Sequence, residues 1–150
     1  MKTLRNIIVA ITMISLLATM GCDSGGEEGQ PDPAMQQVAL LVNEGKPWVA
    51  QAESFVLKDG FDVSDQFEGF NVTFSEGTFK TENAISSAWP SEGNWQLSEQ
   101  DLNTILRGDG VAMKTRIIGN TLTLTFRAGG PSGGRITSVE GEYQFELISQ

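Results

Sequence analysis

The chain of 150 residues contains no histidine and a single cysteine, Cys22. The absence of histidine removes the most common general base and metal ligand, together with every Ser-His-Asp or Cys-His catalytic arrangement. A lone cysteine has no partner for a disulfide within the chain and leaves no thiolate metal site. We therefore assign no catalytic residue, and we expect a protein that is not an enzyme and that uses no cofactor or metal.

Basic residues are also scarce, because 10 Lys and Arg stand against 19 Asp and Glu. The net charge of −9 leaves no basic stripe of the kind that binds phosphate backbones, so nucleic acid is not an expected partner. The same balance offers no cationic patch for anionic lipid. Any attachment to a membrane must therefore come from another part of the chain.

Residues 1–21 have the layout of a bacterial lipoprotein signal peptide. Lys2 and Arg5 provide the positive start, and the apolar run 7–17 is too short to span a bilayer as a permanent helix. Such signals are cleaved before a cysteine, which then carries fatty acyl chains such as palmitate on sulfur and nitrogen. We expect Cys22 to be lipidated and the folded part to lie in the cell envelope, outside the cytoplasm.

An ordinary secretory signal remains the alternative. Thr19 and Met20 stand where a lipoprotein signal usually has an aliphatic and then a small residue. In an oxidising compartment, however, an unpaired thiol at Cys22 needs a reason, and lipidation supplies one.

Residues 22–33 form the predicted tether, which contains four acidic residues and no apolar side chain after Cys22. Such a segment buries no surface to offset the entropy of ordering, so we expect it to be flexible. In 34–43, Met35, Val38 and Leu41 recur at helical spacing, which predicts one short amphipathic helix. The folded domain is expected to comprise 34–150.

From Trp48 onward the apolar residues alternate with polar ones, which is the pattern of β-strands. In the clearest segment, Leu122, Leu124 and Phe126 alternate with three threonines, which suit the solvated face of a strand. The predicted strands are 49–57, 70–74, 78–81, 94–97, 103–107, 111–118, 121–126 and 139–147.

The joints between several of these segments have the chemistry of hairpin turns, as at Glu76-Gly77, Asp109-Gly110 and Gly119-Asn120. Sequence-adjacent antiparallel strands close most simply into an up-and-down barrel. We therefore predict an all-β fold, an antiparallel up-and-down barrel or a barrel-like sandwich of about eight strands. One short N-terminal helix is expected to plug an open end.

The same alternation identifies the side chains that should point inward. They are bulky, so we favour an interior filled by side chains over one that holds a small apolar ligand. The predicted inward residues are Phe70, Val72, Phe74, Phe79, Trp95, Leu97, Leu122, Leu124, Phe126, Tyr143, Phe145 and Leu147.

Asp59, Asp62 and Asp65 recur at a spacing of three residues. Their oxygen atoms suit calcium, but the alternating spacing of an EF-hand loop is absent. Asp residues in turns more often bond to nearby backbone groups, and we prefer that interpretation.

Trp48 and Trp95 begin or lie within predicted strands, where an indole ring usually joins the core. Trp89 precedes Pro90 in the long connection 82–92, so we expect it to be partly exposed and to serve as a candidate stacking contact.

The glycine-rich segment 129–135 lacks the Lys-Ser/Thr ending of a phosphate loop and leads into a strand, so a plain loop within the connection 128–137 is predicted. Arg135 at its end and the Tyr143 hydroxyl on the inward face are, with Trp89, the candidate ligand contacts.

The segments 57–70, 88–95, 101–110 and 122–126, taken together, are similar to the lipocalin-like lipoproteins of Bacteroidota. The resemblance covers nearly the whole of the predicted domain. It implies an eight-stranded barrel-like fold and an outer-membrane address, and the acidic stretch after Cys22 resembles the surface-export signals of those lipoproteins. It implies no catalytic residue and no particular ligand.

The predicted function is that of a lipid-anchored, non-enzymatic binding or structural module in the envelope or at the cell surface. Recognition is expected in the connections 82–92 and 128–137. The alternative is a carrier of a small apolar ligand in the barrel, and a less favoured one is a carbohydrate-binding protein or a carboxylate-based glycoside hydrolase. The expected partners are the membrane, through the lipid on Cys22, and a small apolar ligand or a glycan.

Overall fold

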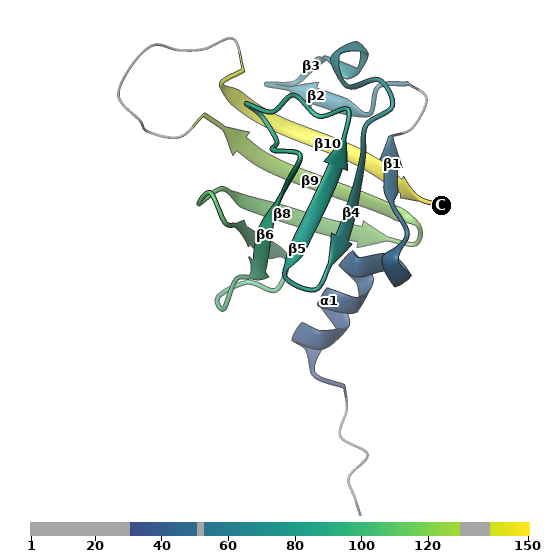
Figure 1. Cartoon of the computed structure of the whole chain (residues 1–150), viewed down its shortest axis with the longest axis vertical. Helices are drawn as coiled ribbons and strands as arrows, with labels where there is room; N and C mark the ends of the chain where they lie inside the picture. The colour runs from purple at the N-terminus through teal and green to yellow at the C-terminus, as the bar shows by residue number, and fades with distance from the viewer. Residues whose placement is uncertain (1–30, 51–52, 130–138) are drawn as a thin grey trace, which may run out of the picture. The chain divides into compact units, whose positions relative to one another are not determined.

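The computed structural model describes residues 31–50, 53–129 and 139–150, and this part of the chain is mostly β-strand (Figure 1). The elements are α1 (Pro33–Val42), the 3-10 helix η1 (Asn43–Gly45), β1 (Trp48–Ala50), β2 (Val56–Lys58), β3 (Phe61–Asp62), the 3-10 helix η2 (Ser64–Phe67), β4 (Asn71–Ser75), β5 (Thr78–Glu82), β6 (Glu92–Leu97), β7 (Thr104–Arg107), β8 (Ala112–Ile118), β9 (Thr121–Ala128) and β10 (Gly141–Ser149).

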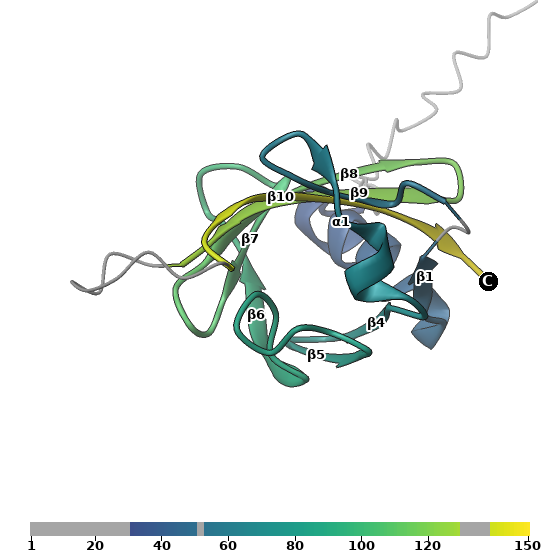
Figure 2. The same cartoon turned by 90° about the horizontal axis from the view of Figure 1, so that it is seen from above.

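Eight strands form a closed antiparallel barrel in the order β1-β4-β5-β6-β7-β8-β9-β10, and β10 returns to pair with β1 (Figure 2). The closing register places Trp48 opposite Ser149 and Ala50 opposite Leu147. Closure gives the barrel strands partners on both edges. The predicted up-and-down barrel is therefore confirmed, and the two-sheet sandwich is not what forms.

The prediction of one continuous strand over 49–57 is wrong, because two shorter strands, β1 and β2, form there instead. Both strands pair antiparallel with β10, where Ala50 lies opposite Leu147 and Val56 lies opposite Phe145. Five residues separate Ala50 from Val56, whereas only Glu146 separates their two partners. The chain bonds to β10 again at Phe55, whose carbonyl accepts a hydrogen bond from the Glu146 amide at 2.8 Å.

The hairpin of β2 and β3 adds to the same edge of β10, so these two strands lie outside the closed ring. Asp59 and Gly60 form its turn with φ of 50° and 83°, the left-handed conformation that a two-residue hairpin of this kind requires. This hairpin was not predicted.

Alternation along the strands places the predicted side chains in the core. Each residue predicted to face inward is buried except Leu97, which is partly buried and packs against the core. On β9 the alternate threonines remain partly exposed, and on β10 Glu142 and Glu146 face outward. The register follows from the two-residue period, because a slip by one would expose the apolar set.

Helix α1 closes one end of the barrel, as predicted, and begins one residue earlier than expected. The Asp32 carboxylate accepts a hydrogen bond from the Ala34 amide at 2.9 Å, and Pro33 occupies the first turn, where no amide partner is needed. Leu41 is fully buried, and its carbonyl accepts a 2.8 Å hydrogen bond from the Trp48 indole. Within the described residues, no helix has the length and apolar character to cross a membrane.

Aromatic side chains fill the interior from the end opposite α1. Phe67 enters from η2, and Trp89 enters from the connection between β5 and β6; both are fully buried. The Trp89 ring lies 5.2 Å from that of Phe126 and 5.4 Å from that of Phe145, and Phe67 lies 5.1 Å from Phe145. An eight-stranded barrel is just wide enough to be filled in this way.

We expect Phe126→Ala to lower the free energy of unfolding by about 3–5 kcal/mol, because it leaves a cavity among these rings. Thr125→Ala, which alters the partly exposed neighbouring position on the same strand, is the control and should have a far smaller effect. Thermal and urea denaturation measure both. Equal melting temperatures would contradict the register.

Candidate functional site

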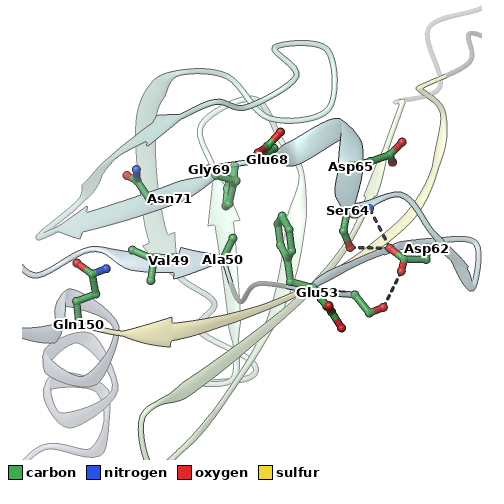
Figure 3. Close-up of a pocket in the computed structure, with 13 residues that line it drawn as sticks. Val49, Ala50, Glu53, Asp62, Ser64, Asp65, Glu68, Gly69, Asn71 and Gln150 are labelled. Atoms are coloured by element: carbon green, nitrogen blue, oxygen red, sulfur yellow. Dashed lines mark hydrogen bonds between the residues drawn. The ribbon is translucent and has the colours of Figure 1, made fainter.

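A polar hollow with a volume of about 1040 Å³ lies beside the interruption between strands β1 and β2 (Figure 3). One side is formed by β1 and residues 53–55, and the other by the start of β4 and the segment that precedes it. The lining residues are Val49, Ala50, Glu53, Ser54, Phe55, Asp62, Ser64, Asp65, Glu68, Gly69, Phe70, Asn71 and Gln150. We call this feature the acidic hollow, because its ionisable residues are all acidic.

The neighbouring core positions the walls of the hollow. Phe55 and Val56 are buried at the point where the chain rejoins β10, and Phe67 anchors η2 in the barrel interior. Gly69 then turns the chain into β4 with a φ of 74°, and its carbonyl accepts a hydrogen bond from the Asn83 side chain at 3.0 Å. Apolar anchors on both sides therefore hold a polar surface between them.

Asp62 is the most constrained polar residue of the acidic hollow. Its carboxylate accepts hydrogen bonds from the hydroxyls of Ser54 and Ser64, each at 2.6 Å, and from the Ser64 amide at 3.0 Å (Figure 3). These bonds lower the pKa of Asp62 from its usual 3.8 to about 2, and the bond from Ser54 has the largest effect. Asp62 is thus a carboxylate at neutral pH and is unsuited to act as a general acid.

The other carboxylates of the hollow do not converge. Glu53, Asp65 and Glu68 are exposed, and Figure 3 shows them directed to different sides. A glycoside hydrolase needs two carboxyl groups that face each other across the sugar, one of them with a raised pKa. The acidic hollow has neither feature, whereas its oxygen atoms are well placed to accept hydrogen bonds from a polar ligand.

The three aspartates considered for calcium, Asp59, Asp62 and Asp65, make different contacts and do not form one site. Asp59 accepts a hydrogen bond from the Glu142 amide at 2.9 Å and so holds the β2–β3 turn against β10. Asp62 bonds to the two serines, and Asp65 lines the hollow without joining that network. Across the described ranges, no group of three or more acidic, histidine or cysteine residues is arranged to hold a metal ion.

Two of the three candidate ligand contacts are described, and both are buried. The expectation that Trp89 is partly exposed is wrong, because its exposed fraction is 0%. Trp89 and Ala88 both donate backbone hydrogen bonds to the Ile85 carbonyl at 2.8 Å, and this turn directs the indole into the barrel. In the sequence, Trp-Pro within a long connection does not indicate which way the ring points.

Tyr143 faces inward as predicted, and its hydroxyl donates a hydrogen bond to the Val139 carbonyl at 3.0 Å. Burial raises the pKa of this hydroxyl above its usual value of 10. The hydroxyl is therefore engaged within the protein. Arg135, the third candidate, lies outside the described residues.

Sequence reasoning missed Arg107, whose side chain is only 4% exposed. Its guanidinium donates to both carboxylate oxygens of Asp109 and to the Ala88 carbonyl, and its centre lies 5.8 Å from the Trp89 ring and 5.5 Å from the Phe126 ring. The hydrogen bond from Arg107 lowers the pKa of Asp109. Arg107 thus ties β7 to the segment that fills the barrel. The period of two from Ile105 could have placed it inward.

We expect Ser64→Ala to raise the pKa of Asp62 from about 2 towards 3.8, because the carboxylate loses a hydroxyl donor. Since the folded-state pKa is lower than that of the unfolded chain, this network stabilises the fold above about pH 4, and the contribution is lost as the pH falls towards 2. The carboxyl carbon shift followed by NMR measures the titration. Ser87→Ala, outside the hollow, is the control, and a wild-type midpoint near 3.8 would contradict the network.

Comparison of the chain with protein-family models, with curated proteins and with solved structures gives no match. Neither a family nor an activity is therefore transferred to this chain, and its function is argued from its own sequence and geometry.

Proposed function

We propose that this protein is a lipid-anchored, non-enzymatic binding module of the cell envelope, attached to the outer membrane through Cys22. The signal-like residues 1–21 and the lone cysteine that follows them support the anchor. The proposal also includes the resemblance to lipocalin-like lipoproteins, which favours the same address.

The observation that carries the proposal is the filled interior. Trp89, Phe67, Phe70 and Phe145 are all fully or almost fully buried and pack ring against ring, so the protein's own side chains occupy the space that a carried ligand would need. This favours a binding module over the alternative, a carrier with an internal ligand.

Because side chains fill the interior, we look for the binding surface on the outside of the protein. In the connection 82–92 the stacking candidate Trp89 is buried with Ala88, and Ala84 and Ile85 pack against the core, so only polar residues of this connection are exposed. Most of the connection 128–137 lies outside the described residues. The acidic hollow is therefore the binding surface that we favour, and its carboxylate, hydroxyl and amide groups suit a ligand rich in hydrogen-bond donors, such as a glycan.

The chemistry of the chain favours binding without catalysis. The exposed carboxylates of the hollow point apart, and the lowered pKa of Asp62 is opposite to what a general acid requires. No histidine is present anywhere in the sequence to act as a base in their place. These features support the proposal over the hydrolase alternative.

Cys22→Ala should abolish lipidation and move the protein from the membrane fraction to the soluble fraction. Growth with an alkyne-tagged palmitate, followed by gel fluorescence and fractionation, measures both. Ser24→Ala, a small change two residues away, is the control and should leave label and membrane attachment unchanged. A wild-type protein that incorporates no label would overturn the anchor.

Native mass spectrometry of the Cys22→Ala protein tests the filled interior. We expect the mass of the polypeptide alone, because the buried rings of Phe67, Trp89 and Phe145 occupy the interior that a tightly held guest would need. A stoichiometric apolar adduct that survives purification would instead favour the carrier. Phe126→Ala, which opens space among the rings, is the positive control and should bind a small aromatic compound such as benzene.

A further inference from the structure

The indole N–H of Trp89 differs from those of the other two tryptophans, although all three rings are buried. The Trp48 and Trp95 indoles donate hydrogen bonds to backbone carbonyls at 2.8 and 2.9 Å. Trp89 is fully buried, yet its Nε1 atom has no acceptor among the described residues. A buried donor without an acceptor is unfavourable, because it has lost the hydrogen bond that it makes to water. The barrel interior therefore fits the rings of Trp89 but not their polar edge.

Trp89 enters the barrel from a connection, 83–91, that is not part of the closed ring of strands. Strands β5 and β6 pair at three positions, the last of which places Lys80 opposite Glu92. The connection lies beyond this pair, and its residues 86–87 are exposed. It can therefore swing outward while the strands of the barrel keep their partners.

Two hydrogen bonds from side chains of the barrel strands hold the inner part of this connection. The Thr81 hydroxyl donates to the Pro90 carbonyl at 2.9 Å, and Arg107 Nη1 donates to the Ala88 carbonyl at 3.3 Å. Both acceptors are immediate neighbours of Trp89 in the chain. Opening of the connection breaks these bonds and exposes few apolar side chains besides the indole, so it costs far less than unfolding of the barrel.

Departure of Trp89 would uncover a space of indole size with aromatic walls and one buried cation. The rings of Phe70, Phe126 and Phe145 lie between 5.2 and 5.4 Å from the Trp89 ring. The guanidinium centre of Arg107 lies 5.8 Å from the same ring. A cation over a ring is attracted to its π electrons, so the space favours an aromatic guest over an aliphatic one.

Arg107 also specifies one polar group of such a guest. It donates to both carboxylate oxygens of Asp109, which neutralise its charge, and its third acceptor is the neutral carbonyl of Ala88. That carbonyl leaves with Trp89, so the guest must supply a neutral oxygen acceptor to Nη1. A second carboxylate would instead bring an uncompensated negative charge into the barrel.

We propose that the barrel contains an internal site for a planar aromatic compound with a neutral carbonyl group, and that Trp89 and the Ala88 carbonyl occupy this site when no such compound is bound. The connection 83–91 opens, the ring of the compound replaces the indole, and its carbonyl accepts the hydrogen bond from Arg107. The apparent affinity is then the intrinsic affinity reduced by the fraction of open protein. Without the compound the closed state prevails, which agrees with the filled interior. The site requires neither the lipid on Cys22 nor the acidic hollow.

NMR of the unlipidated Cys22→Ala protein tests the replacement of Trp89. The three tryptophans give three indole N–H signals, and Trp89→Phe identifies that of Trp89 by its loss. The probe is 1-naphthaleneacetamide, which has two fused rings, a neutral carbonyl and no ring N–H. As the probe is added, we expect the Trp89 signal to move to the position of a solvent-exposed indole and its hydrogen exchange to accelerate about tenfold or more. The signals of Trp48 and Trp95 should stay in place.

Two relatives of the probe test the recognition of its carbonyl. 1-Naphthaleneacetate has the same rings with a negative charge, and 1-ethylnaphthalene has the rings without an oxygen atom. Each should bind about fivefold or more weakly than the amide, because one adds a buried charge and the other leaves Arg107 Nη1 without an acceptor.

Two matched substitutions separate the opening step from the rest of the barrel. Thr81→Val removes the hydrogen bond to the Pro90 carbonyl, so it should favour the open state and tighten the apparent affinity for the amide by about three- to tenfold. Thr123→Val makes the same change at a partly exposed position on β9 and should bind as the wild type does. Melting curves will verify that both variants fold.

Three results would overturn the proposal. They are a Trp89 signal that stays in place in both the wild type and Thr81→Val, equal affinities for the amide and 1-ethylnaphthalene, and shifts confined to outward-facing residues. The last result would indicate binding at the outer surface instead. Because neither the lipid nor the acidic hollow takes part, a failure of the proposed function leaves this test unchanged.

Discussion

The pairing of β10 with three other strands is the constraint on which the rest of the structure depends. β9 occupies one edge of β10 along its length, and β1 and then β2 share the other edge. The pairing of β10 with β1 closes the barrel, and its pairing with β2 brings the chain back to β10 after the interruption between the two strands. Five residues of the chain stand opposite one residue of β10, and the described residues on both sides of this interruption, Val49, Ala50 and 53–55, line the acidic hollow.

The closed ring in turn requires that its interior be filled. Helix α1 covers one end, and Phe67 and Trp89 enter from the other, where the buried Arg107 binds the backbone beside Trp89 through the Ala88 carbonyl. The acidic hollow is polar and lies beside the β2–β3 hairpin, whereas an apolar pocket between α1 and β6 lies at the end of the barrel that α1 covers, where its lining includes the inward-facing Trp95 and Leu97. Their chemistry suits different occupants.

Local patterns were sufficient for most of the barrel. Leu122, Leu124 and Phe126 alternate with threonines, so their inward direction follows from the period of a strand. Glu76-Gly77 and Gly119-Asn120 specify tight hairpins, and both occur as predicted, with Ser75 opposite Thr78 and Ile118 opposite Thr121. The candidate site was not predictable in this way, because Ser54, Asp62 and Ser64 come together only when the chain folds back from β2 through β3.

The sequence by itself determined the signal-like N-terminus, the acidic charge, the all-β class, the short helix predicted at 34–43 and the inward face of each long strand, because each can be read from composition or from neighbouring residues. The tertiary structure decided that the ring closes, that the first predicted strand breaks, that Trp89 is buried rather than exposed, and that Arg107 lies against aromatic rings. Each of these depends on contacts between segments far apart in the chain. Their free energy comes from burial in a shared core, which no local pattern encodes.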